Sequence, residues 1–415
     1  HGEIGGDHRR DDDGAPDAGA VERQPGVSGP LALTVTTLED ELDWGGSDAD
    51  VALMGGAGDL SLREALFLAE LDPATADAIG FAPGLGGGVV RLTRGTLEIR
   101  GAVSIDGDVD GDGRADVVVS GDAAGDDAIR TDLLGLAITD LDGAAYGTRD
   151  DNVRVFLIEG GDADVEIARL AITGGAATTG GGVRLDEGAL DLTGAILAGN
   201  EASVDGGGGL ENANGGLTVD ASLFASNRAG GSGGGLLGTG GPSSFTRISH
   251  STFVANEAGR DGGAVFVGNE DARLVSSTVF GNEGRFSGGV FADGAASLEF
   301  VLRSSVVAGN VDVLGRATDV RLSRTDVNAF TRVDSVAIGN LVGSGEDVFG
   351  RVLVPDGVEG NIAGTVAAPV DAGLGPLADH GGPTPTLLPE ATSRTIDAGA
   401  GITPLPATDA RGAAR

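Results

Sequence analysis

A phrase that ends in asparagine recurs five times in the middle of this 415-residue chain, and it constrains the fold more than any other feature. The phrases are AILAGN, SLFASN, STFVAN, STVFGN and SVVAGN, which end at Asn200, Asn227, Asn256, Asn282 and Asn310. Successive asparagines lie 27, 29, 26 and 28 residues apart. A period of this length is typical of proteins built from stacked structural repeats.

Aligning the phrases on the asparagine produces further columns of similar residues. The column three positions earlier is apolar, and it holds Leu197, Phe224, Phe253, Val279 and Val307. The column eight positions earlier is aliphatic, and it holds Leu192, Val219, Ile248, Leu274 and Leu302. The column five positions earlier is small, and it holds Ala195, Ser222, Ser251, Ser277 and Ser305. A Gly-Gly pair also leads into Val183, Leu210, Leu236, Ala264 and Val290.

These short alternating runs have no helical period, so we predict an all-β parallel β-helix, a solenoid with about 27 residues per coil. Equivalent positions of successive coils would lie about 4.8 Å apart. Aliphatic columns would then fill the interior, the asparagines would form a hydrogen-bonded ladder, and Gly-Gly would permit sharp bends. A β-sandwich with coincidental spacing is the alternative, but it explains neither the asparagines nor the Gly-Gly phase. Residues 89 to 310 have room for about 8 coils.

The flanking segments differ from the coils. LTVTT (33–37) predicts a strand, and DLSLREALFLAELD (59–72) predicts an amphipathic helix with a capping box formed by Ser61 and Glu64. We expect this helix to cap the open N-terminal end of the solenoid. Proline is nearly absent between Pro83 and Pro355 and frequent afterwards. The predicted divisions are an N-terminal extension (1–30), a strand and capping helix (31–88), the coils (89–350) and a proline-rich closing module (351–415).

Both ends of the chain resemble a known family. LTVTT…DLSLREAL, followed by ADAIGFAPGLGGGVVRLTRGTLEIRGAVSIDG, is similar to the start of bacterial surface β-helix proteins with a CSLREA-type motif, with Leu60 in place of the cysteine. GPLADHGGPTPTLLPEATSRTIDAGAG…TDARGAAR (375–415) resembles the closing module of the choice-of-anchor Q family, with His380 where Asn is more usual. The resemblance implies a right-handed parallel β-helix that is exported to the cell surface, usually without assigned catalysis.

One departure from that family suggests how copies associate. The family's TD-x-RG segment continues into a D-[IA]-GAVE strand, but here that phrase occurs instead within DDDGAPDAGAVERQ (11–24). We therefore hypothesise that residues 1–24 complete a neighbouring copy or a preceding repeat, because an open solenoid edge has backbone groups that another strand can cover. The alternative is that the segment folds back onto its own chain or is disordered. The proposed contact residues are Asp17, Ala18, Gly19, Ala20, Val21 and Glu22.

The strongest chemical motif is DGDVDGDGRAD, which has the spacing of a calcium-binding loop. The predicted ligands are Asp108, Asp110, Asp112, the carbonyl of Arg114, and Asp116. Val119 stands where the usual bidentate glutamate would be, so another acid such as Asp106 or Asp122 would have to contribute. The alternative is a solvated acidic turn, because acids are common throughout this chain.

Charge and composition narrow the function. The chain has 63 acidic and 27 basic residues, so its net charge is −36, and all the basic residues are arginines. This balance argues against nucleic acid, and against an anionic membrane, as partners. The chain lacks cysteine, and no stretch approaches the roughly 18 apolar residues of a membrane span. No nucleophile, phosphate-loop or dinucleotide motif stands out, so we predict no catalytic residues.

The sequence as a whole predicts a non-enzymatic extracellular or cell-surface subunit. Copies would assemble head to tail into a filament or stalk, with calcium as a structural cofactor of the acidic loop. The first alternative is a surface adhesin that binds a glycan or protein along its coils. The second is a polysaccharide lyase or hydrolase, because such enzymes share the fold, although an acidic groove would repel polyuronate substrates.

Overall fold

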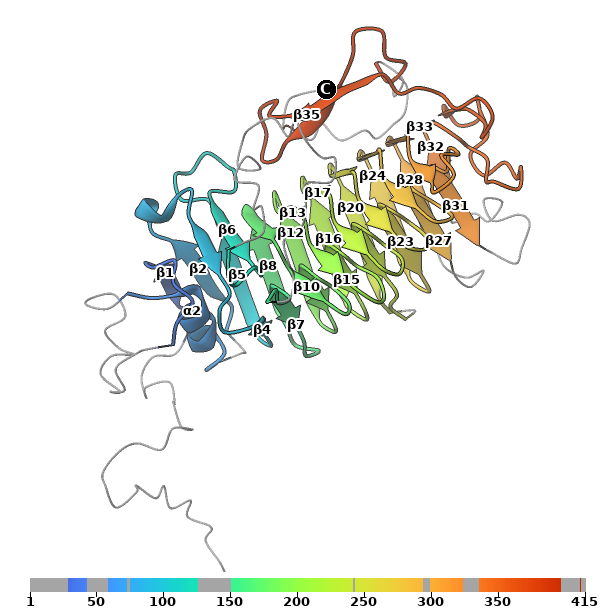
Figure 1. Ribbon diagram of the computed structural model, residues 1–415. Coiled ribbons are helices and arrows are strands. Elements are labelled where there is room, and N and C mark those ends of the chain that lie inside the picture. The colour runs from blue at the N-terminus through green and yellow to red at the C-terminus, as the bar shows by residue number, and fades with distance from the viewer. Residues whose placement is uncertain are drawn as a thin grey trace, which may run out of the picture.

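The computed structural model describes residues 29–42, 59–72, 75–125, 151–241, 243–293, 299–323, 336–396 and 411. In these residues the chain forms an all-β parallel solenoid of about 8 coils, with about 28 residues per turn (Figure 1). The predicted fold class is therefore confirmed. No described helix is long and apolar enough to cross a membrane.

Three long sheets and one short sheet form the walls of the solenoid. Sheet A contains β1 (Ala32–Val35), β2 (Asp77–Phe81), β5 (Ala102–Asp106), β8 (Asp164–Ala168), β12 (Ala189–Thr193), β16 (Gly216–Asp220), β20 (Phe245–Ser249), β24 (Asp271–Val275), β28 (Phe300–Arg303) and β32 (Val336–Ile338). Sheet B contains β3 (Val89–Arg91), β6 (Val117–Ser120), β9 (Leu170–Thr173), β13 (Ile196–Ala198), β17 (Leu223–Ala225), β21 (Thr252–Val254), β25 (Thr278–Phe280), β29 (Val306–Ala308), β33 (Leu341–Val342) and β34 (Ile362–Ala363).

Sheet C contains β4 (Leu97–Ile99), β7 (Phe156–Ile158), β11 (Val183–Leu185), β15 (Leu210–Asn212), β19 (Leu236–Gly238), β23 (Val265–Gly268), β27 (Val290–Asp293) and β31 (Val320–Ser323). Sheet D contains β10 (Ala176–Ala177), β14 (Glu201–Ala202), β18 (Arg228–Ala229), β22 (Glu257–Ala258), β26 (Glu283–Gly284) and β30 (Val311–Asp312). A typical central coil visits sheets A, B, D and C in that order. All strand pairs within these four sheets are parallel, because each strand pairs with its equivalent one coil away.

The strand register confirms the predicted inward columns. Leu192 pairs with Val219, and Leu197 pairs with Phe224, as the alignment on the asparagine requires. The prediction was wrong for one member of the column that follows the Gly-Gly pairs. Leu236 pairs with Val265 rather than Ala264, because Ala264 is equivalent to Gly235, the glycine directly before Leu236 in the preceding coil.

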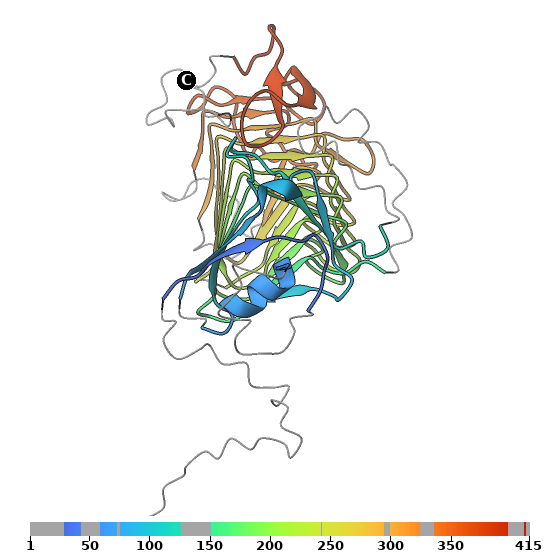
Figure 2. The ribbon, with the colours of Figure 1, turned by 90° about the vertical axis from the view of Figure 1, so that its left-hand side faces the viewer.

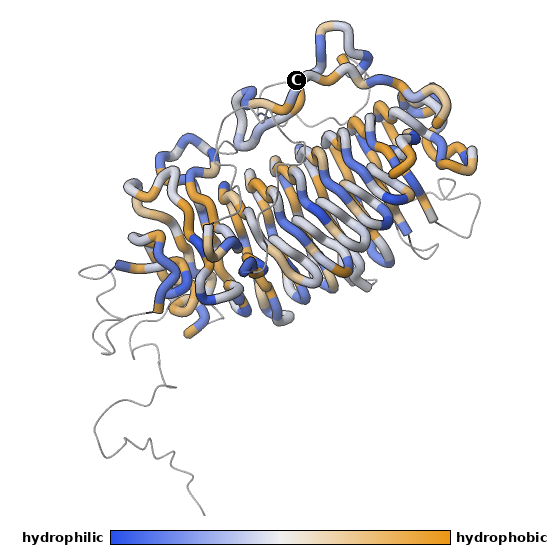
Figure 3. The backbone as a smooth tube through the Cα atoms, viewed as in Figure 1, coloured by the Kyte–Doolittle hydropathy of each residue, from blue (hydrophilic) through white to orange (hydrophobic). Residues whose placement is uncertain are grey.

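The interior is filled by the inward residues of the three long sheets. One continuous cluster of buried aliphatic and aromatic side chains extends from the first coil to the last. Phe224 and Phe253 stack at its centre, with ring centroids 4.6 Å apart. Figure 3 shows apolar and polar residues alternating along the coils, the pattern expected when successive side chains point into the bore and into solvent.

The N-terminal end carries an extra strand and a helix. Strand β1 pairs with β2, so sheet A begins ahead of the predicted coil boundary at residue 89. Helix α2 (Leu62–Ala69) follows the predicted capping box, in which Ser61 accepts from the Glu64 N–H and Glu64 accepts from the Ser61 N–H. Its apolar side is buried, and the helix lies across the first coils in Figure 2. Its role as a cap of the solenoid stays a prediction.

The C-terminal region does not simply continue the stack. Strand β34 extends sheet B. Apart from α2, the only helical element in the described residues is a short 3₁₀ turn far from this region, η1 (Pro83–Leu85). Strands β35 (Leu374–Ala378) and β36 (Thr386–Pro389) then form an antiparallel hairpin that lies along the outer face of sheet B (Figure 1). Leu377 and Leu387 of the hairpin pack on Ile196 and Leu223 of that face. The hairpin therefore covers an apolar wall that would otherwise face water.

Candidate functional site

The five predicted asparagines form a continuous ladder inside the solenoid. The Nδ2 of each of the first four donates to the Oδ1 of the next asparagine at 2.8–3.0 Å, and all five Nδ2 atoms also donate to a backbone carbonyl of the preceding coil. Each Oδ1 additionally accepts from a backbone N–H, which is the preceding asparagine's own N–H for all but the first. All five side chains are buried. The ladder satisfies backbone groups at the turn between sheets B and D, where no strand pairing can do so.

The ladder ends on a carboxylate that the sequence analysis missed. Oδ1 of Asp319 accepts from both the N–H and the Nδ2 of Asn310, at 2.9 and 2.8 Å, and its Oδ2 accepts from the Ser344 N–H at 2.7 Å. Asp319 stands in the column of Gly289, because Val290 pairs with Val320. The absence of a Gly-Gly pair before Val320 was the sequence signal that could have marked Asp319 as an exception.

Burial raises the pKa of Asp319 to about 6, and the three N–H donors limit that rise. A carboxylate can accept from every side, whereas an asparagine would turn its NH₂ group toward the Ser344 N–H. Asp319 therefore ends the ladder with acceptors only. It belongs to the structural frame, and the next coil is attached to it through Ser344.

A second buried acid lies at the corner between sheets C and A. Oε1 of Glu270 accepts from the Thr246 hydroxyl at 2.6 Å, and Oε2 accepts from the Gly240 N–H at 3.2 Å. Burial raises the pKa of Glu270 to about 7 despite these donors. Nothing in the repeat pattern marks this residue, because it stands at a turn whose length varies between coils.

The acidic loop brings together three of its five predicted metal-binding residues. One carboxylate oxygen from each of Asp108, Asp110 and Asp116 lies within 4.8 Å of the others. Two ligands at about 2.4 Å from one calcium ion can be that far apart, so these three oxygens fit calcium. Asp112 does not join the cluster, and its Oδ1 accepts from the Arg114 N–H at 2.9 Å. The Arg114 carbonyl stays a prediction.

The remaining geometry of this loop is less favourable for calcium. Val119 is fully buried in the core, so the twelfth loop position offers no ligand. Asp106 bonds to Arg169, and neither Asp106 nor Asp122 joins the cluster. The Arg169 Nε lies 3.5 Å from Asp108 Oδ2, and backbone N–H groups of the loop also donate to Asp108. These donors partly neutralise the carboxylates without a metal.

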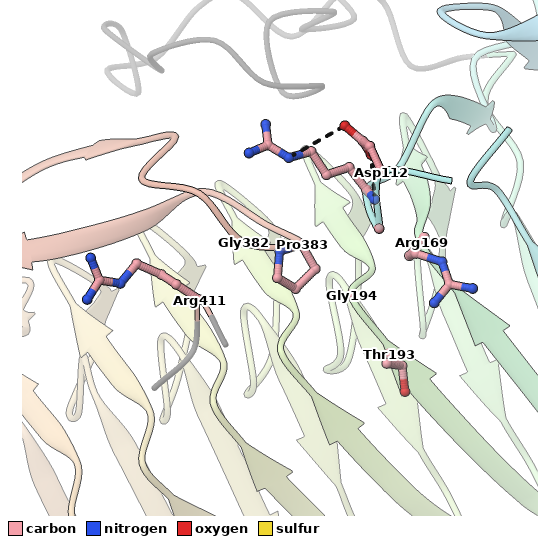
Figure 4. A pocket seen from close by; sticks show the side chains of 9 residues that line it. Asp112, Arg169, Thr193, Gly194, Gly382, Pro383 and Arg411 are labelled. Atoms are coloured by element: carbon pink, nitrogen blue, oxygen red, sulfur yellow. Dashed lines mark hydrogen bonds and ion pairs between the residues drawn. The ribbon is translucent and has the colours of Figure 1, made fainter. Parts of the chain in front are cut away.

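The acidic loop also contacts the C-terminal segment. Both terminal nitrogens of Arg114 donate to the carboxylate of Asp379, at 2.6 and 3.0 Å, which lowers the pKa of Asp379. A shallow pocket lies where the loop, the solenoid wall and this segment meet (Figure 4). Its lining residues are Asp112, Gly113, Arg114, Arg169, Thr193, Gly194, Gly382, Pro383 and Arg411. The pairing of Arg114 and Arg169 with carboxylates leaves these two guanidinium groups little capacity for a further anion.

The outer face of sheet C carries an apolar stripe. Leu237, Phe266 and Phe291 are equivalent outward positions of three successive strands. The rings of Phe266 and Phe291 have centroids 5.1 Å apart, and the Arg321 guanidinium lies 5.2 Å from the Phe291 centroid. Leu237 and Phe291 are buried and Phe266 is half-buried, so the stripe presents little apolar surface to a ligand.

The proposed assembly residues Asp17, Ala18, Gly19, Ala20, Val21 and Glu22 lie outside the described residues. The ends of the solenoid are described in part. In the described residues, sheet A ends at β32 and sheet C at β31, and neither strand has a neighbour on its outer side.

Comparisons of the chain with protein-family models, characterised proteins and solved structures give no match. The class that the fold defines is therefore a parallel β-solenoid protein, and its function has to be argued from its own surfaces.

Proposed function

We propose that this protein is a non-enzymatic structural subunit whose copies join end to end into a filament or surface stalk. The observation that carries the proposal is the difference between the two ends of the solenoid. At the N-terminal end, α2 contacts β1, β2 and β4 and contributes buried side chains to the core. At the C-terminal end, β31 and β32 have no strand on their outer side in the described residues, and only side chains of the following segment, Arg351 and Asn361, bond to their carbonyls. Such edges accept another chain's strand.

Net charge supports association at the ends rather than along the sides. A charge of −36 makes side-by-side contact between copies unfavourable, except in salt-rich media where the screening length is short. An end-on contact brings fewer charges together for the same gain in backbone pairing. The resemblance to exported surface β-helix proteins gives the proposed location, extracellular or at the cell surface.

Electron microscopy of the purified full chain in buffers of low and high salt tests this function. We expect filaments whose axial repeat is near one solenoid of about 8 coils, roughly 40 Å. Deleting residues 1–24 should abolish filaments while circular dichroism still reports the folded coils. Isolated rods of the intact chain under all salt conditions would contradict the proposal, and unchanged filaments after the deletion would exclude the N-terminal segment as the connector.

For the acidic loop we propose a structural calcium ion held by Asp108, Asp110 and Asp116. Three convergent carboxylate oxygens support this proposal, and their separation suits calcium. The ion would replace the repulsion between these carboxylates by attraction and would fix the loop that contacts Asp379.

A further inference from the structure

Two turns near the C-terminal end have the same sequence and the same structure. Residues 312–316 read DVLGR and residues 347–351 read DVFGR, and we call these segments the DVxGR turns. In both, the aspartate N–H donates to the arginine carbonyl at 3.0 Å, and the glycine N–H donates back to the aspartate carbonyl at 2.7 or 2.9 Å. An antiparallel bridge closes each turn, between Val311 and Ala317 and between Glu346 and Val352.

An ion pair with a buried carboxylate and a partly exposed guanidinium group braces each DVxGR turn. The carboxylates of Asp312 and Asp347 are fully buried, and each pairs with the arginine four residues later, at 2.6 Å. Their Oδ1 atoms also accept from two backbone N–H groups of the turn. The glycines adopt φ of +73° and +78°, so a larger residue would strain the turn. The frame is therefore built to hold the intervening residues in one conformation.

The tips of these rigid turns are apolar and face solvent. Leu314 is 73% exposed and Phe349 is 74% exposed. Val313 and Val352 beside them are more than half exposed. The turns are equivalent positions of successive coils, because β29 pairs with β33 at the same offset of 35 residues that separates Asp312 from Asp347. Together these four side chains form an apolar patch, which we call the tail patch.

The tail patch lies at one end of the solenoid. Of the ten large apolar side chains that are exposed in the described residues, five lie between residues 313 and 358. The corresponding strands β31 and β33 are at the end opposite α2 in Figure 1. Two others, Leu42 and Phe67, belong to the segments around α2 at the N-terminal end. Exposed apolar surface is thus concentrated at the two ends.

Charge favours the N-terminal end of another copy as the occupant of the tail patch. The carboxylates of the DVxGR turns are buried, so what they present to solvent are the partly exposed guanidinium groups of Arg316 and Arg351. The described residues 29–42 and 59–72 hold seven acidic residues and one arginine. Asp40 and Glu64 are buried and Arg63 pairs with Asp40, so five acids remain exposed or partly exposed. The N-terminal end therefore offers apolar side chains within an acidic surrounding, which complements an apolar patch flanked by arginines.

We propose that the tail patch docks against the α2 end of a second copy of this chain. The inference rests on the proposed end-to-end assembly and identifies which described residues make the contact. The two surfaces differ, so the contact is heterologous, and such a contact repeats without closing when the rotation between copies does not form a ring. It would position the open strand edges of one copy beside the N-terminal segment of the next.

Cross-linking between cysteine variants tests the pairing of the two ends. The chain contains no cysteine, so each variant carries a single thiol. Mixing Phe349→Cys with Phe67→Cys and adding a short bismaleimide should give mixed dimers. The matched control replaces Phe349→Cys by Val204→Cys, since Val204 is 59% exposed in a turn near the middle of the solenoid. The control should give at least about tenfold fewer mixed dimers.

The outcomes separate this inference from the proposed function. Efficient cross-linking of Phe349→Cys to itself would show tail-to-tail pairing and overturn the inference. Filaments of the unmodified chain without Phe349–Phe67 cross-links would also overturn it while leaving end-to-end assembly intact. Absence of any end-to-end assembly would overturn both.

A substitution test that leaves the frame of the turns intact complements the cross-links. The double variant Leu314→Asp/Phe349→Asp keeps the glycines and the ion pairs, and we expect it to need at least about tenfold more protein for half-maximal assembly. Val204→Asp should assemble like the unmodified chain. A melting curve of each variant confirms that the coils remain folded. Unchanged assembly by the double variant would refute docking through the tail patch. Docking between copies would also be refuted if the tail patch of the unmodified chain bound only lipid vesicles or an unrelated protein.

Discussion

Replacing Asn256 by alanine tests whether the ladder holds the coils together. Its Oδ1 accepts from the N–H and Nδ2 of Asn227, at 3.0 and 2.9 Å. Its Nδ2 donates to the Phe224 carbonyl and to Asn282 Oδ1, both at 2.9 Å. Alanine removes all four hydrogen bonds and leaves the buried Asn227 N–H without this acceptor. At a net value of about 1 kcal/mol for each bond, we expect a loss of about 4 kcal/mol in the free energy of unfolding.

Denaturant unfolding, followed by both circular dichroism and fluorescence, measures this loss, and coincident transitions justify two-state treatment. Asn214→Ala is the matched control, because Asn214 is exposed at a turn of the same solenoid. Its effect should stay within about 0.5 kcal/mol. A loss below about 1 kcal/mol for Asn256→Ala would refute the argument, since it would mean that water or a shifted turn replaces the ladder at little cost.

Three further predictions concern the buried acid, the acidic loop and the helix. Because burial raises the folded-state pKa of Glu270 to about 7, its stabilising contribution is complete below about pH 4.5 and is lost as the pH rises through 7. The unfolding free energy of the unmodified chain, relative to Glu270→Gln, should therefore fall by about 3 kcal/mol over that range, as measured by denaturant titration at each pH. Calcium should raise the melting temperature of the unmodified chain and of Asp191→Asn, an exposed acid on sheet A, but not that of Asp110→Asn; equal shifts in all three would refute the calcium site. If α2 caps the core, Leu66→Ala should cost about 3 kcal/mol and speed hydrogen exchange first in β1 and β2, whereas faster exchange beginning at β32 would contradict the cap.

The acidic loop shows how far spacing alone predicts a site. The spacing of the aspartates identified the loop, and the structure places Asp108, Asp110 and Asp116 together. The sequence could not show that Asp112 would turn to the Arg114 N–H, or that Arg169, more than 50 residues away, would reach the loop. Those contacts depend on which side chains the stacking of coils brings to the same corner.

The periodic part of the fold was determined by the sequence itself. In a parallel solenoid, the spatial neighbour of a residue lies one period along the chain, so aligning the asparagines is enough to give the register of β12, β16 and β20. The register could not be predicted in this way where the repeat is interrupted. Asp319 replaces a glycine of the Gly-Gly column and ends the ladder, which only its distances to Asn310 and Ser344 reveal.

Only the tertiary structure decided where the non-periodic segments lie. The hairpin of β35 and β36 returns along sheet B, so Asp379 meets Arg114 across 265 positions of sequence. The two DVxGR turns become neighbours because their coils stack, although nothing in the turn itself specifies that contact. The physical reason is that a repeated residue meets its own copy at a fixed distance along the chain. A segment that occurs once finds its place through surfaces that exist only after the coils have formed.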